Sequence, residues 1–132
     1  KRPPRPKELG GWWFIRENYD PCAEGAGRGT WICSAIKHKK ADEELNYEWN
    51  RLLSVIKSDK KISLIATQRK WLKKCSTECA KEGIDSGYHP WGLANETFCL
   101  ASKKKERSIE FRELYDCINS GKLNCPQLKD KP

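Results

Sequence analysis

The sequence of 132 residues contains no methionine, only two histidines and no long apolar segment. Because translation starts at methionine, the chain is either the mature product left after removal of a leader or a shortened chain, and export is the simpler explanation. No apolar run approaches the ~20 residues that a helix needs to cross a bilayer. We therefore expect no membrane span.

The residues that catalysis and metal binding usually require are also scarce. His38 lies in a lysine cluster and His89 in a segment rich in glycine and proline, and neither has an evident partner. The chain has no Cys-x-x-Cys motif, no paired-histidine spacing and no glycine-rich phosphate loop. We therefore expect no catalytic residue, no metal site and no cofactor, and hence a protein that is not an enzyme.

Cysteine, by contrast, is abundant. Seven cysteines are too many for an ordinary cytosolic domain, where thiols stay reduced, and are typical of compartments where disulfides persist. This number predicts a periplasmic or secreted protein. The odd count leaves one thiol without a partner within the chain.

The chain is strongly basic, with 26 lysines and arginines against 18 acidic residues and a net charge of +8. Such a charge favours an acidic partner, which could be a nucleic acid, an anionic lipid or polymer, or an acidic protein surface. The lysines are spread over several predicted helices instead of forming one block. This distribution disfavours nucleic acid.

Composition divides the chain into two parts. Residues 1–11 combine four positive charges with three prolines and two glycines, which predicts a flexible basic arm. Residues 12–132 have the size of a single domain with its own core.

Apolar residues in the domain recur at helical spacing in three regions. The first helix begins near Thr30 and reaches Ile56, either as one helix or as two that meet at Lys37 to Lys40. A connector at Ser58 to Lys61 precedes a second helix that ends near Gly83. After a loop from Gly83 to Gly92, a third helix starts at residues 93–95 and ends before Gly121. Trp49, Trp71, Leu45, Leu52 and Phe111 are the expected core, and Gln68 and Asn46 are polar positions beside it.

Strand-like alternation is nearly absent, so the predicted fold is all-α: a small antiparallel bundle of three main helices, with room for a fourth short one, stapled by disulfides. An up-down-up order places Cys22, Cys33, Cys75, Cys79 and Cys99 toward one end. We expect bridges Cys117–Cys125, across a turn, and Cys79–Cys99, on adjoining helices. The leftover thiol could be Cys22, Cys33 or Cys75.

Two aromatic segments are candidates for contact with a partner. Tyr88, His89 and Trp91 lie in the predicted loop next to a proline, and Trp12 and Trp13 follow the basic arm. Rigid aromatic side chains in loops are favoured anchors of interfaces, although they also cover bundle ends.

One set of residues occurs in a characteristic order along the chain: Cys33, Asp42, Leu45-Asn46-Tyr47-Glu48-Trp49, Leu52, Gln68-Arg69-Lys70-Trp71-Leu72, Cys79, Cys99-Leu100, Arg107 and Glu113-Leu114. Together these residues resemble the LprI-like lysozyme-inhibitor domain. The resemblance covers roughly residues 22 to 115, and its pieces are specific only in this order. It implies an exported, helical, cysteine-bearing domain of the bacterial envelope, some of whose relatives inhibit lysozyme. Cys75 departs from it, because it stands where the family's Trp-x-x-x-Arg stretch predicts arginine.

We therefore expect a non-enzymatic binding protein that occludes a lysozyme or another cell-wall hydrolase. Against a strongly cationic lysozyme, a chain of net charge +8 needs an acidic contact surface, for which Asp42-Glu43-Glu44 and Glu48 are candidates. Two alternatives remain open. One is an immunity protein that neutralises an exported toxin, and the other is a domain that binds an anionic polymer such as a nucleic acid or envelope polymer.

Overall fold

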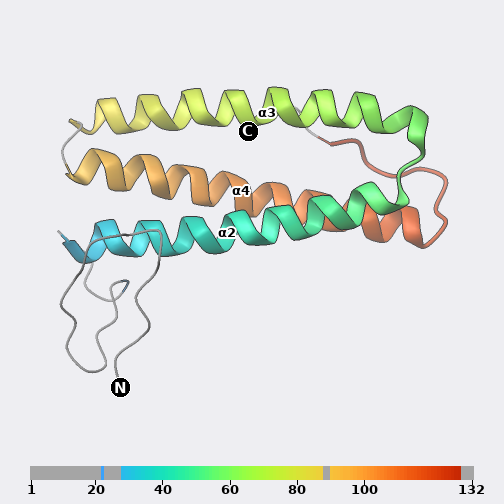
Figure 1. Cartoon of the computed structure of the whole chain (residues 1–132), viewed down its shortest axis with the longest axis horizontal. Coiled ribbons are helices and arrows are strands. Elements are labelled where there is room, and N and C mark those ends of the chain that lie inside the picture. Colours follow the sequence, from blue (N-terminus) through green and yellow to red (C-terminus); the bar gives the residue numbers. More distant parts are fainter. Residues whose placement is uncertain (1–21, 23–27, 88–89, 129–132) are drawn as a thin grey trace, which may run out of the picture.

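The structure, a computed structural model, describes residues 22, 28–87 and 90–128, with the side chains of 28–30 and 90–91 excepted. These residues form three long helices and no strand: α2 (Arg28–Val55), α3 (Ser58–Asp85) and α4 (Pro90–Asn119). Figure 1 shows α4 lying between α2 and α3. α2 and α4 run in the same direction and α3 runs opposite to both, which confirms the predicted up-down-up helical bundle.

The helix ends correct several predicted boundaries. The stretch from Lys37 to Lys40 lies inside one continuous helix, because its lysines point to solvent or to the groove beside α4 without interrupting the helix. α3 begins at Ser58, so the connector is shorter than predicted. Lys57 has an extended backbone, and its carbonyl accepts bonds from the N–H groups of Lys60 and Lys61, which starts the helix there.

The loop between α3 and α4 is also shorter than predicted. Gly83 lies within α3, which ends at Asp85, and the turn that follows uses Gly87 at φ 94°. α4 then begins at Pro90 and not at residues 93–95, because proline is well suited to the first position of a helix. At its other end α4 stops at Asn119, before Gly121 at φ 77°, as predicted.

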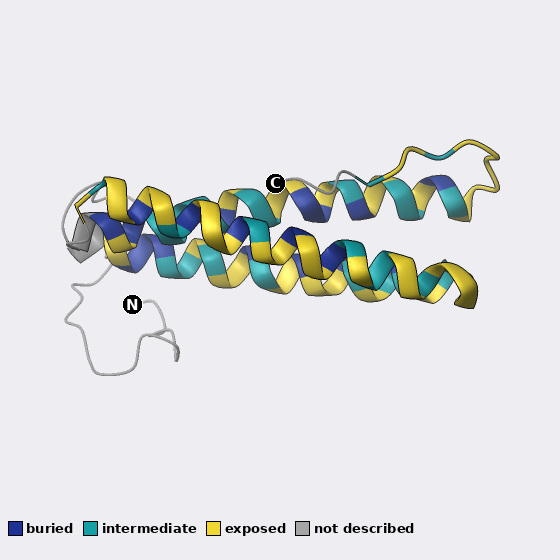
Figure 2. Ribbon diagram, turned by 90° about the horizontal axis from the view of Figure 1, so that it is seen from above, coloured by how far each residue is buried: buried dark blue, intermediate teal, exposed yellow. Residues whose placement is uncertain are grey.

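The hydrophobic core lies along the inner side of all three helices, as the buried residues in Figure 2 show. α2 contributes Leu45 and Leu52, α3 contributes Trp71, and α4 contributes Phe111, which is completely buried. Trp49 is partly buried and its ring lies 5.2 Å from that of Phe111. The predicted core residues are therefore confirmed, with Trp49 at the edge of the core.

A charged side chain is buried in the middle of this core. Arg107 of α4 has an exposed fraction of 0 %, and its guanidinium lies 5.0 Å from the ring centre of Trp71. Its Nε donates a hydrogen bond of 3.0 Å to Oε1 of Gln68, and its Nη1 is 3.3 Å from Oε1 of Glu110. Of the two polar positions beside the predicted core, Gln68 makes a buried hydrogen bond, whereas Asn46 is exposed.

The three disulfides account for six of the seven cysteines. Cys79–Cys99 joins α3 to α4 and Cys117–Cys125 ties the tail to α4, as predicted. Cys22–Cys33 is the third bridge, which resolves the alternatives left open by the sequence. The leftover thiol is Cys75, which lies in the core cluster. Burial raises its pKa to about 11, so it is protonated and unreactive at neutral pH.

We expect Arg107→Ala to destabilise the protein by about 3 kcal/mol or more, because it leaves the Gln68 acceptor buried without a donor and opens a cavity beside Trp71. Urea unfolding followed by circular dichroism measures the change. Arg112→Ala is the matched control, since Arg112 is exposed on the same helix, and should change the stability by less than about 0.5 kcal/mol. Equal effects of the two variants would contradict a structural role for the buried guanidinium.

Candidate partner-binding surfaces

One end of the bundle is held by two disulfides, and we call it the disulfide end. It consists of the start of α2, the end of α3 and the start of α4, which lie together in Figure 1. Cys22–Cys33 closes onto the start of α2, and Cys79–Cys99 joins the two helices on either side of the α3–α4 turn. This end is therefore the most strongly cross-linked part of the described chain.

The α3–α4 turn rests on a close approach between two glycines. A Cβ atom on Gly92 would lie 2.6 Å from the carbonyl oxygen of Gly83, so only glycine allows the two helices this contact. Across the same turn, Asn95 Nδ2 donates a hydrogen bond of 2.9 Å to Oγ of Ser86. These contacts fix the end of α3 to the start of α4.

The side chains of the predicted aromatic anchors are not described by the structure. Trp12, Trp13, Tyr88 and His89 lie outside the described residues. Trp91 belongs to the first turn of α4, but its side chain is not described. Their contact with a partner therefore stays a prediction.

Three exposed apolar side chains, none of them predicted as a contact residue, lie at the disulfide end. Trp31 of α2 is 38 % exposed, Ile84 of α3 is 56 % exposed and Leu93 of α4 is 44 % exposed. Each lies within the first or last turn of its helix. The helical pattern alone could not identify them, because which apolar residues stay exposed at a bundle end depends on tertiary packing.

The disulfide end is also acidic, although the whole chain is basic. The last eight residues of α3 contain Glu78, Glu82 and Asp85 but a single cation, Lys81, which pairs with Asp85 at 3.1 Å. Glu78 and Glu82 are exposed, and Glu78 lies 4.0 Å from Nζ of Lys103 on α4. A cationic partner would therefore meet complementary charge here.

The acidic groups singled out in the sequence are largely engaged within the bundle. Asp42 accepts a bond of 2.8 Å from Nζ of Lys104, and Glu48 is buried and lies 3.2 Å from Nε of Arg51. Only Glu43 and Glu44 are exposed. The predicted acidic surface on α2 is therefore reduced to these two side chains.

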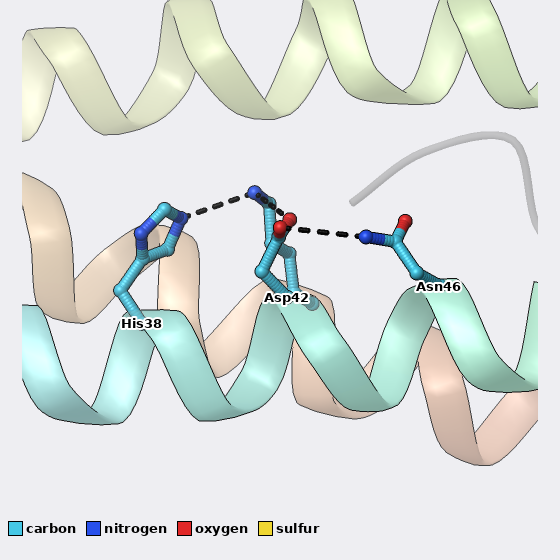
Figure 3. Close-up of polar contacts among 4 residues, drawn as sticks. His38, Asp42 and Asn46 are labelled. Carbon is cyan, nitrogen blue, oxygen red and sulfur yellow. Dashed lines mark hydrogen bonds and ion pairs between the residues drawn. The ribbon is translucent and has the colours of Figure 1, made fainter. Parts of the chain in front are cut away.

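Figure 3 shows the polar contacts that occupy this part of α2. Lys104 of α4 reaches Nε2 of His38 at 3.0 Å as well as Asp42, and Nδ2 of Asn46 lies 3.5 Å from Asp42. A protonated lysine can donate only to a neutral imidazole, so His38 is the acceptor. Burial first, and then the charge of Lys104, lower the pKa of His38, against the opposing effect of Asp42.

A basic groove lies between α2 and α4. The groove has a volume of about 480 Å³ and is lined by Lys37, Lys40 and Lys105, with Phe98 and Glu44 also contributing.

Within the described residues no cluster of three or more potential metal ligands occurs. None of the described helices is long and apolar enough to cross a membrane.

The model of the lysozyme inhibitor LprI family matches residues 22–111, which is more than half of the chain. The chain belongs to the LprI lysozyme-inhibitor family. No curated protein and no solved structure matches it. The matched region of this LprI domain contains Gln68, Trp71 and Arg107, so the residues that carried the resemblance include those that hold α3 against α4.

The three disulfides fit an LprI domain located outside the cytoplasm. The family description names lysozyme inhibition as the activity associated with such domains.

We expect Gly92→Ala to destabilise the LprI domain by about 1–3 kcal/mol, because the new Cβ would push α4 away from the Gly83 carbonyl. The sign of the change in stability distinguishes a crowded position from an uncrowded one. At an uncrowded position inside a helix the same substitution stabilises by about 0.5–1 kcal/mol. Thermal unfolding of the variant measures the change, and an increase in melting temperature would contradict the close approach.

We expect acidification to destabilise the fold through His38. Because the folded-state pKa of His38 is lowered, the unfolded chain binds the proton more readily. The contribution of His38 to the free energy of unfolding is thus fully present above its ordinary pKa of about 6.5. It is lost as the pH falls through the folded-state pKa of His38. Urea unfolding between neutral and mildly acidic pH should show a smaller loss for His38→Gln than for the native chain. Parallel pH profiles would contradict this role.

Proposed function

We propose that this LprI domain is an exported, non-enzymatic inhibitor that binds a lysozyme or another muramidase through its disulfide end and blocks access to the enzyme's cleft. The observation that carries the proposal is the coincidence at one end of exposed apolar side chains, exposed carboxylates and a rigid base. Trp31, Ile84 and Leu93 provide apolar surface, and Glu78 and Glu82 provide charge.

Charge supports this choice of surface. A chain of net charge +8 would be repelled by a cationic enzyme over most of its surface. At the end of α3, as at Glu43 and Glu44 of α2, exposed carboxylates outnumber cations, but only the end of α3 combines them with the exposed apolar side chains of the disulfide end. Association through this end would bring the acidic part of the inhibitor toward the enzyme and keep the basic part away.

Rigidity supports it as well. The ends of α3 and α4 are fixed to each other by the Gly83–Gly92 approach and by Cys79–Cys99. Contact residues on fixed helix ends lose less conformational entropy on association, which increases affinity. We keep Tyr88, His89 and Trp91 as proposed anchors, together with Trp12 and Trp13.

The test is inhibition of bacterial cell lysis by a panel of muramidases that includes an animal-type lysozyme. We expect inhibition that persists at about 0.15 M salt, since contacts within an apolar interface are screened little. Tyr88→Ala and Trp91→Ala should each weaken inhibition by about tenfold or more, with circular dichroism used to verify folding.

Two charge variants of equal net charge identify the surface. Glu78→Gln with Glu82→Gln should weaken inhibition of a cationic lysozyme, whereas Glu43→Gln with Glu113→Gln, at exposed positions away from the disulfide end, should not. The reverse result would favour the acidic residues of α2. If no muramidase is inhibited at micromolar protein, the proposal is wrong. Tight binding of a single exported toxin would then favour the alternative that the chain is an immunity protein.

A further inference from the structure

The middle of α3 has an unusual distribution of charge. Between Asp59 and Glu78, the nearest carboxylates on either side, the helix has no acidic residue over 18 positions. It has six cations in the same segment: Lys60, Lys61, Arg69, Lys70, Lys73 and Lys74.

Four of the six cations gather on the side of the helix that faces away from the core. Gln68, Trp71 and Cys75 are the buried positions of this segment and face the core. Arg69, Lys70 and Lys73 are exposed and Lys74 is partly buried. At about 1.5 Å per residue, Arg69 to Lys74 spans about 7.5 Å along the helix, and Lys60 and Lys61 lie about two turns nearer its start. We call the surface formed by residues 69, 70, 73 and 74 the α3 outer face.

Elsewhere in the described chain, several cations are compensated by nearby acids. Lys104 contacts Asp42, Lys81 contacts Asp85 and Arg51 contacts Glu48. On the α3 outer face, positive charges follow one another along the helix with no carboxylate of α3 between them. A row of like charges on a rigid helix is complementary to a linear polyanion, whose binding releases its condensed counterions.

The side chains of this face indicate which class of polyanion fits it. Binding of single-stranded nucleic acids uses exposed aromatic rings on which bases stack. The one aromatic residue in the segment, Trp71, is only 1 % exposed because it belongs to the core. A membrane-surface helix needs a continuous apolar face toward the lipid, whereas the main apolar face of α3 is packed in the bundle and only Ile62 and Leu72 are exposed large apolar side chains in this segment.

We propose that the α3 outer face binds a linear polymer whose charged groups are phosphates and which carries no bases. Such a polymer would lie along the helix and contact Arg69, Lys73 and Lys74 in succession. This surface is distinct from the disulfide end, so the two could be occupied together and neither requires the other.

The test uses a fluorescently labelled synthetic glycerol phosphate oligomer, with binding to the full chain followed by anisotropy over a range of salt concentrations. The α3 variant is Arg69→Gln/Lys73→Gln/Lys74→Gln. The control is Lys37→Gln/Lys40→Gln/Lys105→Gln, which removes the same charge from the groove between α2 and α4. Glutamine keeps the helix propensity of lysine and arginine, so both variants should fold.

We expect the α3 variant to bind at least tenfold more weakly at low salt, and the control to bind within about threefold of the native chain. At about 0.7 per lost phosphate contact, the slope of log affinity against log salt should fall by about 2 in the α3 variant. Inhibition of a muramidase by the α3 variant should be unchanged, which separates this proposal from the proposed function.

Several results would overturn the proposal. Equal losses in the two variants would mean that net charge and not the α3 outer face is responsible, and full binding by the α3 variant would exclude this face. Tighter binding of oligothymidylate than of the glycerol phosphate oligomer would indicate a nucleic-acid surface. Binding to anionic phospholipid vesicles without binding to the free oligomer would indicate a membrane surface.

Discussion

The arrangement of α3 against α4 depends on the buried guanidinium of Arg107. A fully desolvated cation is tolerated only where acceptors and aromatic faces replace its hydration, and here Gln68, Glu110 and Trp71 do so. Because Gln68 and Trp71 are one turn apart on α3, the arginine meets both in a single register. A slip of one helical turn, about 5.4 Å, would remove both partners at once. The core packing, the disulfide between the two helices and the glycine contact at the turn all share this register.

Fixing the register also fixes where charge lies on the surface. α3 has four cations on its outer face and three of its four carboxylates in its last eight residues, so one helix carries surfaces of opposite sign. The net charge of the chain therefore describes neither surface. A partner that approaches the disulfide end meets apolar and acidic groups, and a partner that approaches the side of α3 meets a basic row.

Much of this fold could be predicted because periodicity along a helix reports which side is buried. Leu45, Trp71 and Phe111 lie on strong apolar stripes and are core residues, and helix order brought Cys79 next to Cys99. Helix ends were predicted less well, since apolar spacing does not mark where a helix starts. Ser58 and Pro90 begin their helices because of local backbone geometry.

The candidate site was harder to predict than the fold. Arginine is rarely buried, so nothing in its local sequence shows that Arg107 is completely enclosed. Likewise, Trp31 and Leu93 become neighbours of the same surface only when three helix ends meet, and the engagement of Asp42 by Lys104 depends on a residue more than sixty positions away. These features arise from contacts between helices, which a pattern within one helix does not contain.

The disulfide pattern has a consequence for how the chain matures. Each cysteine that is bridged pairs with its next bridged neighbour in sequence, at separations of 11, 20 and 8 residues. In a chain that crosses a membrane N-terminus first, every bridge can form as its second cysteine emerges, before the next pair arrives. Cys75 alone could disturb this order, since it emerges before both Cys79 and Cys99. Once the helices have packed, Cys75 is buried in the core cluster, which keeps its thiol from exchanging with the bridges that have already formed.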